Sequence, residues 1–316
     1  MSEPARSSRI HIFLPVHNRR AVTEQFLRCL QRQTYPHWHL LLIDDGSVDG
    51  TSEMARSLVP ELTLLRGEGD WWWAGALHQG YRWVSTAGLP ADDLVLMIND
   101  DTEIGPDFLA NAVAAMRPRS LLLAQAYRSN GDFCEAGVFW DWKNLRCTGV
   151  AAHEEINCFS TRGLFLYAGD LLRIGGFYPR MLPHYLSDYE FTIRAHRQGF
   201  ALRSSPDVSL RYFEALTGIR STEGLSIWRT LKTNLSIKSS SNPFHWTSFV
   251  ILASPRRYLV SNLVRVWWRY LAPVHDVFLL PARRRLGYLR SLAGRVKRKL
   301  KRDWLGKTEQ DIRAGK

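Results

Sequence analysis

The sequence predicts an α/β fold in which a mostly parallel sheet carries polar residues at one edge. Three apolar runs of strand length end in polar residues: Ile10 to Val16, His39 to Ile43 and Leu94 to Ile98. Amphipathic helical patterns separate the runs, and strands that alternate with helices form parallel sheets with right-handed crossovers. Ligands of such sheets bind outside the carboxyl ends of the strands. We therefore expect the residues that follow these runs to share one crevice.

The other elements follow in chain order. Residues 21–32 place Val22, Phe26, Cys29 and Leu30 at helical spacing between the first two strands. Beyond the second strand, the patterns predict a helix over residues 50–58, a third strand over 62–65 and a helix over 75–85. The alternation then returns to the apolar run that begins at Leu94, so the first hundred residues predict a complete set of crossovers.

Asn99, Asp100 and Asp101 directly follow that apolar run. Two adjacent carboxylates at the end of a buried strand are costly unless a cation offsets their charge, and a divalent cation that holds a phosphate is a common solution. Alternatively, the acidic residues favour the N-terminus of a helix that begins at Pro106. The helix alternative does not explain why the other strand ends are polar too, so a site for a nucleoside diphosphate is the preferred interpretation.

Four motifs in this order resemble the family 2 glycosyltransferases: Pro15-Val16-His17-Asn18, Asp44-Asp45-Gly46-Ser47, Asp49-Gly50-Thr51 and Asn99-Asp100-Asp101. The resemblance runs from about Ile10 to Phe213. It implies an inverting enzyme with the Rossmann-like, nucleotide-diphospho-sugar-binding fold called type A. Gly75-Ala76 and Gly80 resemble a segment of bacterial rhamnosyltransferase-like members. We expect a catalytic domain over residues 1–238 and a helical, basic region over 239–316.

The resemblance assigns the donor site to residues of three motifs. The nucleotide would be bound by Pro15, Val16, Asn18, Asp44, Asp45 and Asp100. Asp44 and Asp45 would accept hydrogen bonds from the base and the ribose, although Asp-Gly-Ser is also ordinary turn chemistry. Asp101 would ligate Mg²⁺ or Mn²⁺, which offsets the charge of the diphosphate leaving group. Many family members add a His ligand; Leu210 to Glu214 contains none, and Glu214 is the candidate to replace it.

Asp188 is the candidate catalytic base. The segment from His184 to Phe191 resembles the family pattern Glu-Asp-x-Asp-Leu, with Ser187 in the first position and Glu190 in the second acidic one. An inverting transfer needs one carboxylate to remove the proton of the acceptor hydroxyl as its oxygen attacks opposite the leaving diphosphate. Ser187 and Glu190 also fit a helix capping box, which would hold Asp188 in place.

A donor or acceptor pocket is expected around Trp73, Gly75, Arg162, Gly163 and Glu190. Thr161-Arg162-Gly163 resembles the acceptor-side loop of the family. Trp71-Trp72-Trp73 either borders a sugar or base through its aromatic faces or covers the sheet as core. We expect at least one of the three to be buried without a ligand contact.

The positive charge is concentrated near the end of the chain. Residues 255–316 contain 17 Lys and Arg against 4 Asp and Glu, whereas all other residues contain 25 against 26. Apolar residues recur there at three- and four-residue steps between basic ones: Leu286, Leu289, Ala293, Val296, Leu300 and Trp304. Basic amphipathic helices are typical of membrane surfaces. Nucleic acid and packing against the protein are the alternatives; we favour the membrane and expect no nucleic-acid partner.

Together these features predict a cytoplasmic enzyme, peripheral on the inner face of the plasma membrane. No run of about 18 apolar residues is present, so no membrane span is expected. The reaction would move a sugar from dTDP-rhamnose or a UDP-sugar to a glycan acceptor, lipid-linked through a polyprenyl carrier, in bacterial surface polysaccharide (O-antigen) biosynthesis. A nucleotidyltransferase is disfavoured because Pro15 to Arg20 lacks the glycines of a triphosphate loop. A non-catalytic, membrane-bound scaffold that binds sugar nucleotides remains the other alternative.

Overall fold

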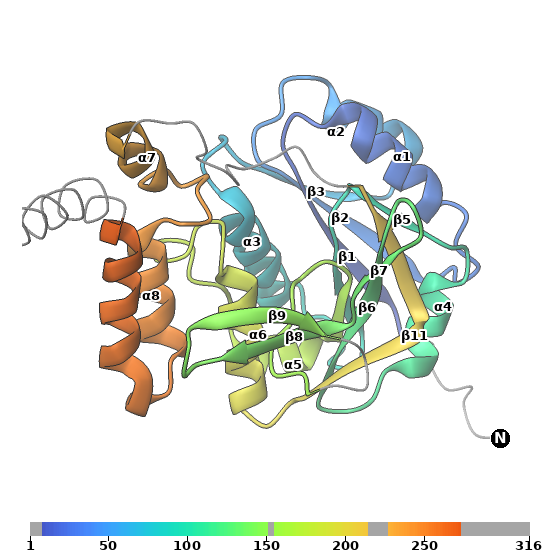
Figure 1. The fold of residues 1–316 in the computed structure, drawn as a ribbon. Coiled ribbons are helices and arrows are strands. Elements are labelled where there is room, and N and C mark those ends of the chain that lie inside the picture. Colours follow the sequence, from blue (N-terminus) through green and yellow to red (C-terminus); the bar gives the residue numbers. More distant parts are fainter. Residues whose placement is uncertain (1–7, 151–154, 214–226, 273–316) are drawn as a thin grey trace, which may run out of the picture.

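The computed structural model describes residues 8–150, 155–213 and 227–272, which are built around a nine-stranded sheet with the strand order β3-β2-β1-β4-β10-β6-β11-β5 and β7 paired to β6 (Figure 1). The neighbours β3, β2, β1 and β4 are parallel, as are β6 and β11, whereas β10, β5 and β7 run antiparallel to their partners. The strands of this sheet are β1 (Ile10–Val16), β2 (Trp38–Asp44), β3 (Thr63–Arg66), β4 (Leu94–Met97), β5 (Thr102–Ile104), β6 (Ser120–Arg128), β7 (Phe133–Glu135), β10 (Leu164–Tyr167) and β11 (Ala201–Tyr212). The predicted α/β fold is therefore confirmed, but the sheet is mixed and not mostly parallel, because four of its strand pairs are parallel and four are antiparallel.

Helices cover both faces of the sheet (Figure 1). On one face lie α1 (Arg20–Leu30), α2 (Thr51–Leu58) and α4 (Phe108–Ala115); on the other lie α3 (Trp72–Thr86), α5 (Ala168–Ile174) and α6 (Ser187–Arg197). Strand residues alternate between the two layers, so Leu40 and Leu42 pack under α1 and α2 while Leu41 and Ile43 pack under α3. Because helices bury both faces of the sheet, the strands are continuous apolar runs in the sequence.

The predicted elements form with small shifts at their ends, and the largest shift is at α3. It begins at Trp72, earlier than the expected start at residue 75, because Asp45 accepts the backbone N–H groups at its first turn. Further along, α3 lies very close to β1: a Cβ on Gly80 would stand 2.5 Å from Cε2 of Phe13. Glycine at this position is therefore required by helix-to-sheet packing.

A third apolar cluster joins the C-terminal helices to the rest of the protein. It is built by the hairpin of β8 (Gly137–Asp141) and β9 (Arg146–Val150), by α6, by α8 (Pro243–Ala253) and by a helix over residues 259–272. Trp140 is 1% exposed and lies 4.8 Å from the ring of Phe249 in α8. The predicted domain boundary at residue 239 is therefore not a boundary in packing. The short elements α7 (Ile227–Asn234) and η1 (Arg256–Tyr258) flank α8.

The stripe from Leu286 to Trp304, on which the membrane expectation rests, lies outside the described residues. Among the residues that are described, no helix combines the length and apolar character needed to cross a bilayer.

Candidate active site

The carboxyl ends of β1, β2 and β4 meet at one cavity of about 330 Å³. Its lining includes five residues predicted from the motifs: Pro15, Val16, Asp45, Trp73 and Asp100. The rest is formed by residues that include Arg19, Trp72, His184 and Lys238. Parallel strands end at the same sheet edge, and this places motifs that are far apart in sequence around one space. We refer to it as the first cavity.

Asp100 and Asp101 share the guanidinium of Arg19. Nε of Arg19 lies 2.9 Å from Oδ1 of Asp100, and its Nη2 lies 3.3 Å from Oδ2 of Asp101. Thr23 donates its hydroxyl to Asp100 at 2.8 Å. Burial raises the pKa of Asp100 to about 6, although Arg19 and Thr23 oppose the shift. The pair is therefore buried negative charge that depends on a cation.

Asp101 has one carboxylate oxygen that lacks a partner within the described structure. Its Oδ1 is buried and has no hydrogen-bond partner among the described residues. A carboxylate oxygen left in this state is costly, and a divalent cation would satisfy it. The described part of the chain contains no group of three or more His, Cys, Asp or Glu side chains that could hold a metal. A cation at Asp101 would thus need oxygens from its substrate, and Glu214 lies outside the described residues.

Asp45 fixes the backbone of residues 69–72 at the edge of the first cavity. Its carboxylate accepts the backbone N–H of Gly69 at 2.9 Å, of Trp71 at 2.9 Å and of Trp72 at 3.1 Å. Asp44 lies deeper and is 0% exposed. The backbone N–H of Ser47 and the hydroxyl of Ser52 both donate to it. Asp44 therefore serves the turn, and the nucleotide contact predicted for it finds no support in the structure.

Asp188 lies in a second cavity of about 370 Å³ that adjoins the first. Trp73, Asn99 and His184 line both cavities. Arg162, which precedes the antiparallel strand β10 at the same sheet edge, lines the second cavity with Asp188. Its aromatic wall consists of Trp73, Trp140, Tyr185, Tyr189 and Trp246. The structure thus gathers the acidic residues of three separate segments around one continuous space.

The carboxylate of Asp188 is tuned toward neutral pH. Burial raises its pKa to about 6, and the negative charge of Glu135 adds to the shift, while the Tyr189 N–H at 3.0 Å and the charge of Arg162 oppose it. Burial also raises the pKa of Glu135, although Arg162 and the Ser160 hydroxyl oppose this. A carboxylate with a pKa near the working pH is suited to accept and release a proton.

Several predicted site residues have structural positions instead. Gly75 lies inside α3, and a Cβ there would meet the Trp71 side chain at 3.1 Å. Gly163 has a φ of 80°, and a Cβ there would lie 2.7 Å from Leu210. Glu190 is 3% exposed and pairs with Arg194 at 2.9 Å. None of the three lines either cavity, so their placement in the pocket stays a prediction.

Two further expectations need adjustment. Asn18 is exposed and shapes the turn after β1, because its side-chain oxygen accepts the Val48 N–H at 2.9 Å. The capping box of α6 does not form: Leu186 is the N-cap residue and the Ser187 hydroxyl donates to the carbonyl of His184. Asp188 is instead the second residue of the helix, where its carboxylate accepts the N–H of Tyr189.

The three tryptophans divide between core and cavity. Trp71 packs against the face of the sheet that α3 covers and lines neither cavity, but all three tryptophans are only partly buried, so the expected buried one is not found. Trp72 faces the first cavity, with Lys238 Nζ 5.8 Å from its ring centroid. Trp73 lines both cavities and donates its indole N–H to Thr161 at 3.0 Å. This bond links the start of α3 to the loop that carries Arg162.

Sequence reasoning missed several residues of the site: Arg19, Glu135, Trp140, His184 and Trp246. Arg19 could have been found, because a basic residue next to Asn18 at a strand end is a phosphate-site signal. Glu135 and Trp140 belong to short strands far from any motif, and Trp246 belongs to a helix assigned to another domain. Only the tertiary contacts bring these residues to Asp188.

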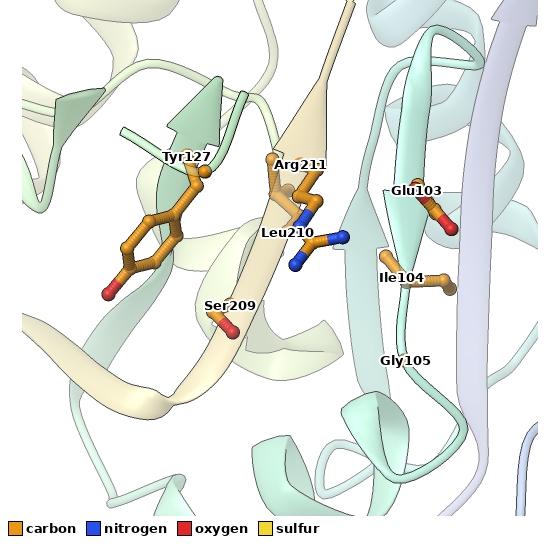
Figure 2. Close-up of a pocket in the computed structure, with 8 residues that line it drawn as sticks. Glu103, Ile104, Gly105, Tyr127, Ser209, Leu210 and Arg211 are labelled. Atoms are coloured by element: carbon orange, nitrogen blue, oxygen red, sulfur yellow. The ribbon is translucent and has the colours of Figure 1, made fainter. Parts of the chain in front are cut away.

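A larger cavity, of about 490 Å³, lies away from these residues (Figure 2). It lies over β6, β11 and β5, where Tyr127, Arg211 and Glu103 follow one another across the strands. None of the predicted site residues lines it. The candidate site is therefore identified by its chemistry, not by cavity size.

Replacing Arg19 with Met should destabilise the protein. Two buried carboxylates would lose their cation, and removing one partner of such a group costs about 1–3 kcal/mol when the cation is partly exposed. The deficit should be largest above neutral pH and shrink as the pH falls toward the pKa that Asp100 has beside Arg19, about 6, because a protonated carboxyl needs no cation and the pKa is higher without Arg19. Denaturant unfolding across this pH range measures it. Arg20→Met, in an exposed neighbour, is the control, and equal losses in both variants would contradict this account of Arg19.

Comparison with known proteins gives a family match and a fold match. Residues 11–154 match a family model described as glycosyl transferase family 2. No curated protein sequence matches the chain.

Three solved structures resemble the fold. Mannosyltransferase PcManGT from Pyrobaculum calidifontis, in complex with GDP-Man and Mn²⁺, has a TM-score of 0.50 at 18% identity, covering 92% of this chain and 81% of that one. TarS 1–349 from S. aureus, in complex with UDP-GlcNAc, has a TM-score of 0.54 at 15% identity, covering 84% and 73%. GalNAc-T7 with UDP, GalNAc and Mn²⁺ has 0.56 at 12%, covering 88% and 59%. At such identities the likeness establishes the fold, and it confirms the type A expectation.

Proposed function

We propose that this glycosyltransferase, whose residues 11–154 match family 2, transfers a sugar from a nucleoside diphosphate donor to a hydroxyl of a glycan. The transfer inverts the configuration of the anomeric carbon. The donor would occupy the first cavity and the acceptor the second. Asp188 would act as the base.

One observation carries the proposal: the two cavities share Trp73, Asn99 and His184. A sugar attached to a diphosphate beside Asp100 would need to present its anomeric carbon toward the second cavity, where Asp188 lies. An inverting transfer requires this arrangement, because the base and the leaving group stand on opposite sides of the reacting carbon.

In the proposed step, the acceptor hydroxyl gives its proton to the carboxylate of Asp188 as its oxygen forms the new bond to the anomeric carbon. The bond from that carbon to the diphosphate oxygen breaks, and the electron pair leaves with the nucleoside diphosphate. Asp188 is suited to this role because its pKa of about 6 leaves it deprotonated at neutral pH. The partly buried site around it also limits water that would compete with the acceptor.

The leaving group acquires negative charge and needs cations nearby. A divalent cation held by Asp101, with Asp100 beside it, would supply Lewis-acid stabilisation of the diphosphate when bound. The unsatisfied Oδ1 of Asp101 supports such a ligand, and two of the similar structures contain Mn²⁺. Arg19 borders the same cavity and adds a positive charge, as does Lys238.

The lining of the second cavity is suited to a carbohydrate acceptor. Aromatic rings that line a cavity pack well against the C–H faces of sugars, and polar groups among them fix orientation. Here Trp140, Tyr185 and Trp246 stand with Arg162 and Asp188 around the second cavity. The buried indole N–H of Trp140 and the Nε of Arg162 have no hydrogen-bond partner in the described part of the protein.

Within this class, we propose dTDP-rhamnose or a UDP-sugar as the donor and a lipid-linked glycan of bacterial surface polysaccharide synthesis as the acceptor, at a membrane surface. The segment Gly75-Ala76 and Gly80 supports the rhamnosyl subtype by resemblance. The similar structures contain GDP-Man, UDP-GlcNAc or UDP with GalNAc, which supports a nucleoside diphosphate as the shared element. The basic end of the chain supports an anionic membrane.

A panel of nucleotide sugars tests the donor assignment. We expect dTDP-rhamnose or a UDP-sugar to raise the melting temperature of the full chain, and Mn²⁺ to increase the shift, because a ligand that binds only the folded state stabilises it. Release of nucleoside diphosphate in the presence of the same donor then reports turnover. The absence of any shift with every nucleotide sugar, with and without Mn²⁺, would contradict the proposal. Binding without turnover in the presence of lipid-linked glycan acceptors would favour the scaffold alternative.

A further inference from the structure

Exposed apolar side chains concentrate in the C-terminal helices. Residues 227–272 form the shortest of the three described segments, yet nine of the large apolar side chains that are exposed lie in it. They are Trp228, Leu235, Ile237, Phe244, Ile251, Val260, Val264, Trp268 and Leu271. Their elements, α7, α8 and the helix over 259–272, gather on the side of the molecule away from α1 and α2 (Figure 1). We call this set of residues the C-terminal apolar face.

The last described helix has two apolar sides. Leu259, Leu263, Val266 and Trp267 pack into the third cluster, which accounts for one side. Val260, Val264, Trp268 and Leu271 recur at steps of four, four and three residues, so they lie on one stripe of the helix. Val260 is 73% exposed and Val264 is 63% exposed. Packing in the third cluster therefore does not explain why Val260 and Val264 are apolar.

The α8 helix repeats the pattern. Phe244 and Ile251 are seven residues apart, two helical turns, and are 58% and 55% exposed. Phe249 and Val250 from the same helix are fully buried in the third cluster. Neighbouring helices thus each bury one apolar side and expose another.

The charge of residues 227–272 indicates what kind of partner binds the C-terminal apolar face. Residues 227–272 contain seven Lys and Arg and no Asp or Glu. Residues 273–316, which follow without a break, contain 13 Lys and Arg against 4 Asp and Glu. A second copy of the face, or the basic end of the same chain, would bring like charges together. An anionic lipid surface supplies both the apolar interior and the opposite charge.

We propose that the C-terminal apolar face docks on an anionic lipid bilayer. The apolar side chains would enter the interface between head groups and acyl chains, and Arg256, Arg257 and Arg265 would contact lipid phosphates. This refines the membrane prediction made for residues 239–316, because it places the contact on exposed residues of folded helices instead of on the stripe from Leu286 to Trp304.

The face adjoins the acceptor side of the site, and this part of the inference rests on the proposed function. Trp246 of α8 and the nearby Ser240 line the second cavity. The same two residues line a third cavity of about 270 Å³, together with Val266 and Tyr270 of the last helix. The helices that would contact lipid thus also border the route to Asp188, as a lipid-linked acceptor requires.

Vesicle flotation with the full chain tests the docking face. Wild-type protein should float with vesicles of phosphatidylcholine and phosphatidylglycerol, and much less with phosphatidylcholine alone. The triple variant Ile251→Ser, Val260→Ser, Val264→Ser should bind the anionic vesicles about tenfold more weakly, because three partly inserted aliphatic groups are lost. Leu172→Ser, which removes an exposed apolar residue of α5, should bind like wild type. Circular dichroism and melting temperature confirm that each variant is folded.

The outcomes separate docking from catalysis. Unchanged vesicle binding by the triple variant would overturn the proposal, as would equal binding to neutral and anionic vesicles. A wild-type dimer that becomes monomeric in the triple variant, without loss of vesicle binding, would assign the face to a second copy. Turnover of the donor is measured on the same proteins with a lipid-linked glycan acceptor in detergent, without vesicles: its absence in wild type would refute the proposed function but leave the docking result standing.

Discussion

Replacing Asp188 with Asn should lower the transfer rate about a thousandfold, within the range found for the loss of a general base. The amide keeps the size of the side chain and its hydrogen bond from the Tyr189 N–H, but it cannot accept the proton of the acceptor hydroxyl. Donor binding should persist, because Asp188 lines only the second cavity. Nucleoside diphosphate release measures the rate, and the thermal shift with donor measures binding.

The transfer rate and the donor affinity of Asp188→Asn together identify the base. Wild-type donor affinity together with lost turnover fits Asp188 as the base, whereas loss of both would indicate a damaged fold. Turnover within a few-fold of wild type would move the base to another residue, and Glu135 would be the next candidate because it is the carboxylate whose charge acts on Asp188.

The pH profile gives a second test of the same residue. The rate should rise with pH through an apparent pKa of about 6, because the base must be deprotonated and burial, with help from the Glu135 charge, holds its pKa above the ordinary value. Glu135→Gln removes the negative charge, so the rising limb should move to lower pH. A limb that moves to higher pH, or that stays unchanged, would contradict the electrostatic role of Glu135.

Replacing Asp101 with Asn should remove most metal-dependent activity. The change removes the charge that pairs with a cation at the one buried carboxylate oxygen without a partner in the described residues. We expect turnover to fall by about a hundredfold or more. The part of the melting-temperature shift that requires both Mn²⁺ and nucleotide should disappear, which thermal denaturation detects independently of turnover.

Glu103→Gln is the matched control for this variant. Glu103 is an exposed carboxylate on β5, lines only the outlying cavity of Figure 2 and should leave Mn²⁺ dependence unchanged. A normal Mn²⁺-dependent shift in Asp101→Asn would remove Asp101 from the metal site. Activity that is independent of metal in the wild type would instead give Arg19 and Lys238 the task of stabilising the leaving diphosphate.

The sequence indicated the first cavity better than the second. Pro15, Val16 and Asp100 follow strands whose apolar runs are visible in the chain, and parallel strands must end at a common edge. Asp188 was found by resemblance, since nothing in local periodicity distinguishes it from Glu190 two residues later. The structure separates the two: Asp188 faces a cavity, whereas Glu190 is buried in an ion pair with Arg194.

The alternation of buried strands and amphipathic helices by itself determined the α/β fold and the sheet edge that carries the site, because hydrophobic periodicity and parallel pairing are local properties of the chain. Only the tertiary structure decided what Glu135, Trp140 and Trp246 do. Trp140 and Trp246 reach Asp188 through the third apolar cluster, where a hairpin, α6 and α8 pack across about a hundred residues of sequence, whereas Glu135 comes from β7 of the main sheet. Contacts between such distant segments depend on shape and burial in three dimensions, which no local pattern encodes.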